Sequence, residues 1–341
     1  MANAFSNTLS VINGSSDTLL PTDISLGSQP TGIGVNPSTN RVYVLLKNVN
    51  TVAVIDGSSD TLLSTIAGIS TPNGGVGVNP LTNMIYVANF ESGNVTVIDG
   101  SSNTMVTSIK VGQFPEDVGV NPSTNRVYVA NQGSDTVTVV DGSSNTLVTT
   151  ITGVGPSPAG VVVNPTSNRV LVSNQGSNTV SIIDGSSNTI VANVTVGSAP
   201  SGTGVNPNSN KFYVGNFNSH TLSVIDGSSN MVIKTISLSG GPNGLTANPT
   251  TNKIYVANPN ENRVDIIDGN SNTLVATIPP LEGDVNRDCK VDIIDLATVG
   301  AAFGSTPSSP NWKPNADRNH DNTIDIIDLV IVASNFGKTC A

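Results

Sequence analysis

The chain has 341 residues, with 14 Lys+Arg against 24 Asp+Glu, which gives a formal net charge of −10 at pH 7. Such an acidic, lysine-poor chain is a poor ligand for polyanions, which argues against a large nucleic-acid interface. Two histidines and two cysteines exclude an enzyme with a multi-histidine copper or zinc centre. No apolar run approaches the roughly 18 residues of a membrane-spanning helix, so we expect no membrane insertion.

The charge is unevenly distributed along the chain. Residues 1–281 hold 9 Lys+Arg and 15 Asp+Glu, whereas the 60 residues that follow hold 5 and 9. Acidic residues are therefore denser in the short C-terminal segment. This shift in composition, near Pro279-Pro280, predicts two domains, at residues 1–281 and 282–341.

A repeat of about 42 residues fills the first segment. Each unit contains four short runs rich in Val, Ile, Thr and Tyr, as strands prefer, typified by 119–120, 126–130, 136–140 and 146–152. An Asn-Pro linker and an Asp-Gly linker read as tight hairpin turns, because Asn and Asp can bond their own backbone two residues on and glycine supplies a positive φ. The Asn-Pro pairs begin at 36, 79, 121, 164, 206 and 248, and the Asp-Gly pairs at 56, 99, 141, 184, 226 and 268. Four strands in such a unit predict an all-β fold made of β-propeller blades.

The second run of each unit resembles the YVTN-type β-propellers of surface-layer proteins. The resemblance covers residues 1–281 and implies a propeller that is commonly seven-bladed, but it says little about function, because one fold hosts many functions. Leu171 replaces the tyrosine in the fourth copy. The copies that carry the motif contain Tyr43, Tyr86, Tyr128, Tyr213 and Tyr255, which we expect to pack between blades.

Six complete units follow a partial one at the N-terminus. Residues 1–3 align with the end of a second strand, and residues 7–23 with the third and fourth strands. The chain therefore begins inside a blade, and we expect a secretion signal and the missing strands upstream. The alternative is that the partial blade borrows strands from a neighbouring molecule, which would build an oligomer or filament.

The C-terminal segment contains the same twelve-residue pattern twice. Oxygen-bearing side chains stand at loop positions 1, 3, 5, 9 and 12, and position 7 offers a backbone carbonyl, as calcium requires. The first loop comprises Asp284, Asn286, Asp288, Lys290, Asp292 and Asp295, and the second comprises Asp317, Asn319, Asp321, Thr323, Asp325 and Asp328. We expect two Ca²⁺ ions here, since two would cancel the net −4 of the tail. A short apolar helix should follow each loop, over 296–303 and 329–336, ending at Gly304 and Gly337.

This duplicated pattern resembles a type I dockerin over residues 283–340. The resemblance implies that loop positions 10 and 11 help to recognise a cohesin-type partner, and here they are Ile293-Ile294 and Ile326-Ile327. Cellulosomal dockerins often carry small hydroxyl residues there, so the identity of the partner stays open. The alternative for these isoleucines is internal packing.

The two cysteines also lie in this segment. Cys289 occupies loop position 6, where glycine is usual, and Cys340 stands next to the C-terminus. The ends of a dockerin approach each other, so the resemblance makes a disulfide plausible; two free thiols are the alternative. A bond would indicate an oxidising compartment.

The loops on one face of the propeller vary between units, and a binding site is expected there. His220 is the only propeller histidine, and its loop is expected to be exposed, so no catalytic constellation is apparent. The variable loops contain Lys47, Phe90, Glu91, Phe114, Glu116, Asp117, Phe217, His220, Glu261 and Arg263.

These features predict an extracellular or cell-surface protein without catalysis. Its propeller would serve as a binding platform of unknown ligand, and its calcium-folded tail would dock to a cohesin-type protein. One alternative is a self-associating structural subunit of a surface layer or filament. Another is an accessory of polysaccharide degradation, or a propeller lyase or hydrolase.

Overall fold

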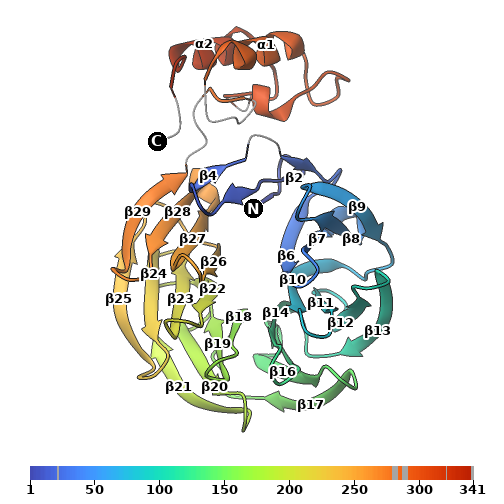
Figure 1. Cartoon of the computed structure of the whole chain (residues 1–341), viewed down its shortest axis with the longest axis vertical. Coiled ribbons are helices and arrows are strands. Elements are labelled where there is room, and N and C mark those ends of the chain that lie inside the picture. Colours follow the sequence, from blue (N-terminus) through green and yellow to red (C-terminus); the bar gives the residue numbers. More distant parts are fainter. Residues whose placement is uncertain (21–22, 279–282, 286–290, 320, 339–341) are drawn as a thin grey trace.

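A computed structural model shows the strands as a ring of blades around a central axis, with two helices outside the ring (Figure 1). It describes residues 1–341 except 21–22, 279–282, 286–290, 320 and 339–341. The predicted all-β, seven-bladed propeller followed by a small helical region is confirmed. Within the described ranges, no helix is long and apolar enough to cross a membrane.

Six blades are antiparallel four-stranded sheets whose strands follow one another from the axis outward. The first strand of a unit is longer than its composition predicts: the run expected at 119–120 extends over Pro115–Asn121. Glycine permits close contact there, because a Cβ on Gly119 would lie 2.8 Å from Val161 of the next blade. The six blades are β6–β9 (Pro30–Asn36, Arg41–Leu46, Thr51–Asp56, Thr61–Ile66), β10–β13 (Pro72–Asn79, Met84–Asn89, Asn94–Asp99, Thr104–Lys110), β14–β17 (Pro115–Asn121, Arg126–Asn131, Thr136–Asp141, Thr146–Ile151), β18–β21 (Pro158–Asn164, Arg169–Asn174, Thr179–Asp184, Thr189–Thr195), β22–β25 (Pro200–Asn206, Lys211–Asn216, Thr221–Asp226, Met231–Ser237) and β26–β29 (Gly244–Asn248, Lys253–Asn258, Arg263–Asp268, Thr273–Ile278).

The N-terminal residues form the seventh blade from short strands. One sheet has the order β1-β2-β5, and β3 pairs with β4 in a separate hairpin. Figure 1 shows these strands between β26–β29 and β6–β9, as the alignment of residues 1–3 and 7–23 predicts. The strands are β1 (Ala2–Asn3), β2 (Thr8–Leu9), β3 (Ile12–Asn13), β4 (Thr18–Leu19) and β5 (Ile24–Ser25).

The hairpin turns are stabilised by their first side chain, as predicted. Asn121 Oδ1 accepts a hydrogen bond from the Ser123 N–H at 3.0 Å, and Asp141 Oδ1 accepts one from the Ser143 N–H at 2.8 Å. The role expected for the glycine is wrong, because the positive φ of 54° falls on Asn145 rather than on Gly142. Glycine is needed at 142 for space, since a Cβ there would lie 2.3 Å from the Oδ1 of Asn125.

The hydrophobic core is divided among clusters that lie between neighbouring blades. Tyr86, for example, packs with Val118, Val127 and Val129 of the following blade. The tyrosines of the repeat therefore pack between blades, as predicted. Tyr43, Tyr86, Tyr128 and Tyr213 are fully buried, and Tyr255 is partly buried against the N-terminal blade.

The C-terminal segment contains two α-helices and a small core of its own. α1 (Ile293–Ala302) and α2 (Ile326–Ser334) each begin three residues earlier than expected, because Asp292 and Asp325 act as N-caps. Gly304 and Gly337 have positive φ after the helices, as predicted. The core includes residues of both helices, and Trp312 packs against it. Short 3₁₀ helices are η1 (Lys47–Val49), η2 (Pro259–Glu261) and η3 (Pro314–Ala316).

Candidate functional site

The second predicted calcium loop folds as a compact turn in which the loop's own backbone N–H groups donate to its polar side chains. Asp317 accepts hydrogen bonds from the N–H groups of Asp321 and Asn322, at 3.2 and 2.9 Å. Asn319 Oδ1 accepts from the Asp321 N–H at 3.1 Å, and Asp321 Oδ1 accepts from the Thr323 N–H at 2.8 Å. Alternate side chains along the loop therefore accept hydrogen bonds from its backbone.

The last two acidic residues of this loop also form the start of α2. Asp325 caps the helix by accepting from the Ile327 N–H at 2.7 Å. Asp328 reaches back to the Asp325 N–H at 2.8 Å, which completes a capping box. The other oxygen of Asp328 accepts from the Arg318 N–H at 2.6 Å. Asp328 thus ties the beginning of the loop to the beginning of the helix.

The first loop repeats this arrangement wherever the structure describes it. Asp295 accepts from the N–H groups of Val285 and Asp292, at 2.7 and 2.8 Å, and Asp292 caps α1. Asp284 is 6% exposed. The other predicted ligands of this loop, Asn286, Asp288 and Lys290, lie outside the described residues, as do Cys289 and Cys340.

The donor set of the second loop fits a hard cation. Among the residues the structure describes, no three His, Cys, Asp or Glu side chains already converge as a metal cluster. The carboxylates of Asp317 and Asp328 are nevertheless 4% and 0% exposed, and only backbone N–H groups are seen to bond to them. Burying negative charge is costly without a counter-charge. Calcium takes several oxygen ligands, including amide and carbonyl oxygens such as those of Asn319 and Thr323.

The four isoleucines at loop positions 10 and 11 are exposed. They are the first two residues of each helix, and the exposed fractions are 67% and 53% for Ile293 and Ile294, and 61% and 50% for Ile326 and Ile327. Internal packing, the alternative considered from sequence, is not what the structure shows. Val330 and Phe336 add exposed apolar surface to the second helix and the residues just after it.

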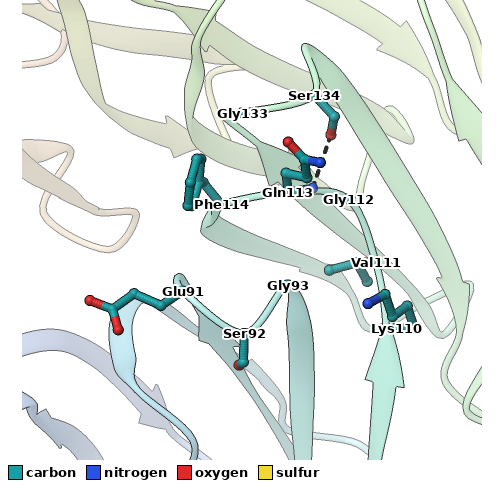
Figure 2. A pocket seen from close by; sticks show the side chains of 10 residues that line it. All are labelled: Glu91, Ser92, Gly93, Lys110, Val111, Gly112, Gln113, Phe114, Gly133 and Ser134. Carbon is teal, nitrogen blue, oxygen red and sulfur yellow. Dashed lines mark hydrogen bonds between the residues drawn. The ribbon is translucent and has the colours of Figure 1, made fainter.

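A separate pocket of 650 Å³ lies on the variable face of the propeller, between the blades β10–β13 and β14–β17. Glu91 and Phe114 line it, as their place in variable loops suggested, and the Phe114 ring stacks on Phe90 with centroids 5.0 Å apart. Figure 2 shows the pocket with Lys110 and Gln113 also at its wall. Lys110 and Gln113 were not expected from the sequence because they flank the varying positions.

Other residues singled out in the variable loops have structural surroundings. His220 is exposed in a turn with φ of 51°, as expected. Asp117 accepts hydrogen bonds from the N–H of Val118 at 2.9 Å and from the N–H of Val161, in the next blade, at 2.8 Å. Burial raises the pKa of Asp117 to about 6, against the opposing effect of these hydrogen bonds. The carboxylate therefore connects two blades.

Solved structures share the propeller fold. A chain described as "Kuenenia stuttgartiensis Hydrazine Synthase" aligns with a TM-score of 0.66 and 20% identity, over 73% of this chain and 86% of that one. A functionally unknown protein from Desulfotomaculum acetoxidans DSM 771 aligns with a TM-score of 0.71 and 15% identity, over 82% and 94%. At such identities the likeness concerns the fold alone. The YVTN-type name is consistent with it and stays a prediction.

No curated protein sequence matches the chain. A family model, the dockerin type I domain, matches residues 282–336. The match contains both predicted calcium loops and both helices. Type I dockerins typically bind calcium and dock to cohesin-type partners, and they occur in extracellular or cell-surface proteins. Residues 282–336 therefore match the dockerin type I domain, and they follow a seven-bladed β-propeller in this chain.

Proposed function

We propose that this protein is an extracellular, non-catalytic docking component. Its tail binds a cohesin-type protein in the presence of calcium, and its propeller presents a further ligand or partner surface. We place the division between the two parts at residues 281 and 282. The observation that carries the proposal is the exposed Ile-Ile pair at the start of each helix, immediately after a calcium-type loop.

The exposed pairs support docking because of where they lie. An exposed apolar side chain at a helix start is not stabilised by its contact with water. Clusters of exposed apolar groups mark interaction sites. Ile293-Ile294 and Ile326-Ile327 follow corresponding capping residues, Asp292 and Asp325. Either half of the tail can therefore present the same pair to one partner.

Calcium would act by fixing the helix starts. We assign one ion to each loop, with the predicted oxygen ligands of that loop around it. Asp295 and Asp328 each connect the start of a loop to the start of its helix by hydrogen bonds. A cation beside these carboxylates would offset their buried charge and stabilise the loop. Removing calcium should then destabilise the two helix starts that carry the exposed isoleucines.

The propeller supplies a platform instead of an active site in this proposal. The pocket beside Phe114 combines an exposed aromatic ring with Glu91, Lys110 and Gln113, a mixture suited to binding. His220 is exposed, and its side chain forms no hydrogen bond with the described residues. No constellation of nucleophile and base therefore supports catalysis by the described part of the propeller.

Biolayer interferometry on the full chain tests the docking function. A panel of type I cohesin modules would be applied in calcium buffer and in EGTA. We expect saturable binding in calcium and none in EGTA, with binding restored when calcium is returned. Binding that is equal in both buffers would contradict the role of calcium, and no binding to any module, by a chain that takes up calcium, would contradict the partner class.

Calorimetric titration with calcium separates metal binding from docking. Asp317→Asn and Asp321→Asn should each weaken the second site, because they remove carboxylate charge from its loop. Asp135→Asn, an exposed aspartate in the propeller, is the matched control. Two binding events in the parent chain are expected, and a chain that takes up no calcium would overturn the assignment.

A further inference from the structure

The loops that line the pocket of Figure 2 have equivalents at other interfaces between blades, which makes them directly comparable. The linker 111–114 leads from the outermost strand of one blade to the innermost strand of the next. The N–H groups of Gln132 and Gly133 donate to the carbonyls of Phe114 and Gln113, at 2.9 and 3.0 Å. The equivalent bonds at the next two interfaces run from Gln175 to Ser157, Gly176 to Pro156, Phe217 to Ala199 and Asn218 to Ser198.

Four side chains of the pocket are larger than those at the equivalent positions. They are Phe114 (Ser157 and Ala199 elsewhere), Gln113 (Pro156 and Ser198), Lys110 (Thr195 and Ser237) and Glu91 (Gly176 and Asn218). All four line the same pocket. The other blades fold with the same backbone bonds and without these side chains. Their presence together at one interface is therefore not explained by the fold.

Phe114 is the most unusual of the four. Its φ is 49°, a left-handed conformation that bulky residues rarely adopt, and the residue is 45% exposed. The ring is nevertheless held in place, because it stacks on Phe90 at an interplanar angle of 22° and a Cβ on Gly133 would lie 2.3 Å from it. Backbone outliers of this kind concentrate at ligand sites. We infer that the ring provides a contact surface for a ligand.

The polar side chains of the pocket are available to a ligand. Glu91, Lys110 and Gln113 are exposed, and within the described residues their side chains form neither an ion pair nor a hydrogen bond. The nearby backbone is already occupied, because the N–H groups of Gly112 and Gln113 donate to neighbouring side chains, both at 3.1 Å. Recognition at this pocket therefore depends on side chains and not on strand pairing.

The four side chains together define the chemistry of the ligand. One carboxylate and one ammonium leave the pocket without net charge, which favours an uncharged ligand over an anion or a cation. Glu91 only accepts hydrogen bonds, Lys110 only donates them and the Gln113 amide does both. The ligand therefore needs groups that donate as well as accept, and a flat apolar face for the ring of Phe114. Hydroxyl groups around a ring with C–H faces, as in a sugar, meet both needs.

We propose that the pocket between β10–β13 and β14–β17 binds a neutral saccharide. The C–H face of one sugar ring would pack against Phe114. Its hydroxyl groups, or those of the next ring, would donate to Glu91 and accept from Lys110 and Gln113. The volume of 650 Å³ lies within the range of roughly 300–1,000 Å³ that is usual for small-molecule sites. Because it names the ligand class of the propeller platform, this assignment rests on the function proposed above.

Calorimetric titration of the full chain with neutral trisaccharides tests the assignment. The probes are cellotriose, maltotriose, laminaritriose, mannotriose and xylotriose, which differ in linkage and stereochemistry but carry no charge. We expect at least one of them to bind, with one molecule per chain and with equal affinity in calcium and in EGTA, since the pocket contains no residue of the calcium loops. Trigalacturonic acid and the fully deacetylated chitosan trimer, which are charged, should bind more weakly than the best neutral probe.

Variants that install residues from equivalent positions test the pocket while keeping the fold. Phe114→Ala copies Ala199, whose φ is 52°, and should weaken binding at least about tenfold because the aromatic contact surface is lost. Gln113→Ser copies Ser198 and should weaken binding about threefold or more. Phe217→Ala, in a variable loop of another blade, is the matched control and should bind the probe as the parent chain does. Unfolding temperatures within a few degrees of the parent would show that each variant is folded.

Three results would overturn the assignment. The first is that no neutral trisaccharide binds to the folded chain, and the second is that a charged trisaccharide binds more tightly than every neutral one. The third is that folded Phe114→Ala binds the probe as tightly as Phe217→Ala does. Cohesin binding by the same preparations separates this site from docking. Saccharide failure with intact docking contradicts the pocket alone, and docking failure with intact saccharide binding contradicts the role of the tail alone.

Discussion

The hydroxyl of Tyr255, in the last complete blade, donates a hydrogen bond to Asp17 of the N-terminal blade at 2.8 Å. Lys253 forms an ion pair with the other oxygen of the same carboxylate. Apolar contacts accompany them, because Ile12 and Leu19 pack against the last blade. The beginning and the end of the propeller are therefore joined through one aspartate.

Substitution of Tyr255 by phenylalanine should destabilise this junction. The change removes a hydrogen bond to a carboxylate but keeps the ring, so we expect a loss of about 1–2 kcal/mol in the free energy of unfolding by urea. Tyr86→Phe is the matched control, since the Tyr86 hydroxyl is buried and has no partner within the described residues. That variant should stay within about 0.5 kcal/mol of the parent or gain stability. A larger loss at Tyr86 than at Tyr255 would contradict this account.

Substitution of Gly142 by alanine should be costly although its φ is ordinary. The added Cβ would clash with Asn125 and lie 2.9 Å from the hydroxyl of Tyr86. Overpacking of this kind costs about 1–3 kcal/mol. Gly244→Ala is the control, because nothing lies within 4 Å of its added Cβ. Equal unfolding curves for the two variants would show that space at the Asp-Gly turn is not limiting.

The stability of the propeller should fall between about pH 4 and pH 6. Burial raises the pKa of Asp117 from 3.8 to about 6. The folded state then holds the Asp117 proton more tightly than the unfolded chain does. The protonated carboxyl therefore contributes fully to the stability of the folded state below about pH 4, and this contribution is lost as pH rises through about 6. Burial also raises the pKa values of Glu116 and Asp265. The aspartates of the Asp-Gly turns, such as Asp141, have lowered pKa values. Their titration therefore affects the stability of the protein only below this pH range.

Urea unfolding at pH 4.5 and pH 7 measures this effect. Asp117→Asn should reduce the difference in stability between the two pH values, by at most about 3 kcal/mol for a shift of about two pKa units. Asp135→Asn, an exposed aspartate, should leave the difference as in the parent chain. An unchanged difference in Asp117→Asn would show that this carboxylate does not titrate as its burial predicts.

Because the exposed Ile-Ile pair occurs twice, we predict that either pair can support docking without the other. Substituting both isoleucines of one pair, Ile293 and Ile294, by alanine should leave cohesin binding measurable through Ile326 and Ile327. Substituting both pairs should weaken binding at least about thirtyfold, because buried anchors of an interface contribute about 2 kcal/mol or more. Calcium uptake should be unchanged, since these side chains are exposed and carry no oxygen. Complete loss after changing a single pair would show that only that half docks.

The period of the repeat was enough to predict the blades, because each turn is stabilised locally. Asn121 and Asp141 bond to backbone groups two residues ahead, which any sequence analysis can anticipate. The calcium-type spacing was visible for the same reason, since all its ligands lie in one short loop. The first strand was underestimated because Pro115–Asn121 has little strand propensity of its own and is held by neighbouring blades.

The sequence by itself determined the propeller, its partial first blade, the two loops and the helices that follow them, since these depend on local spacing and composition. Only the tertiary structure showed that glycine at 142 is required for space and that the four isoleucines are exposed. It also joined Asp17 to Tyr255, although 238 positions separate them in the chain. Closing a ring brings together residues that are far apart in the chain, and local patterns contain no record of such contacts.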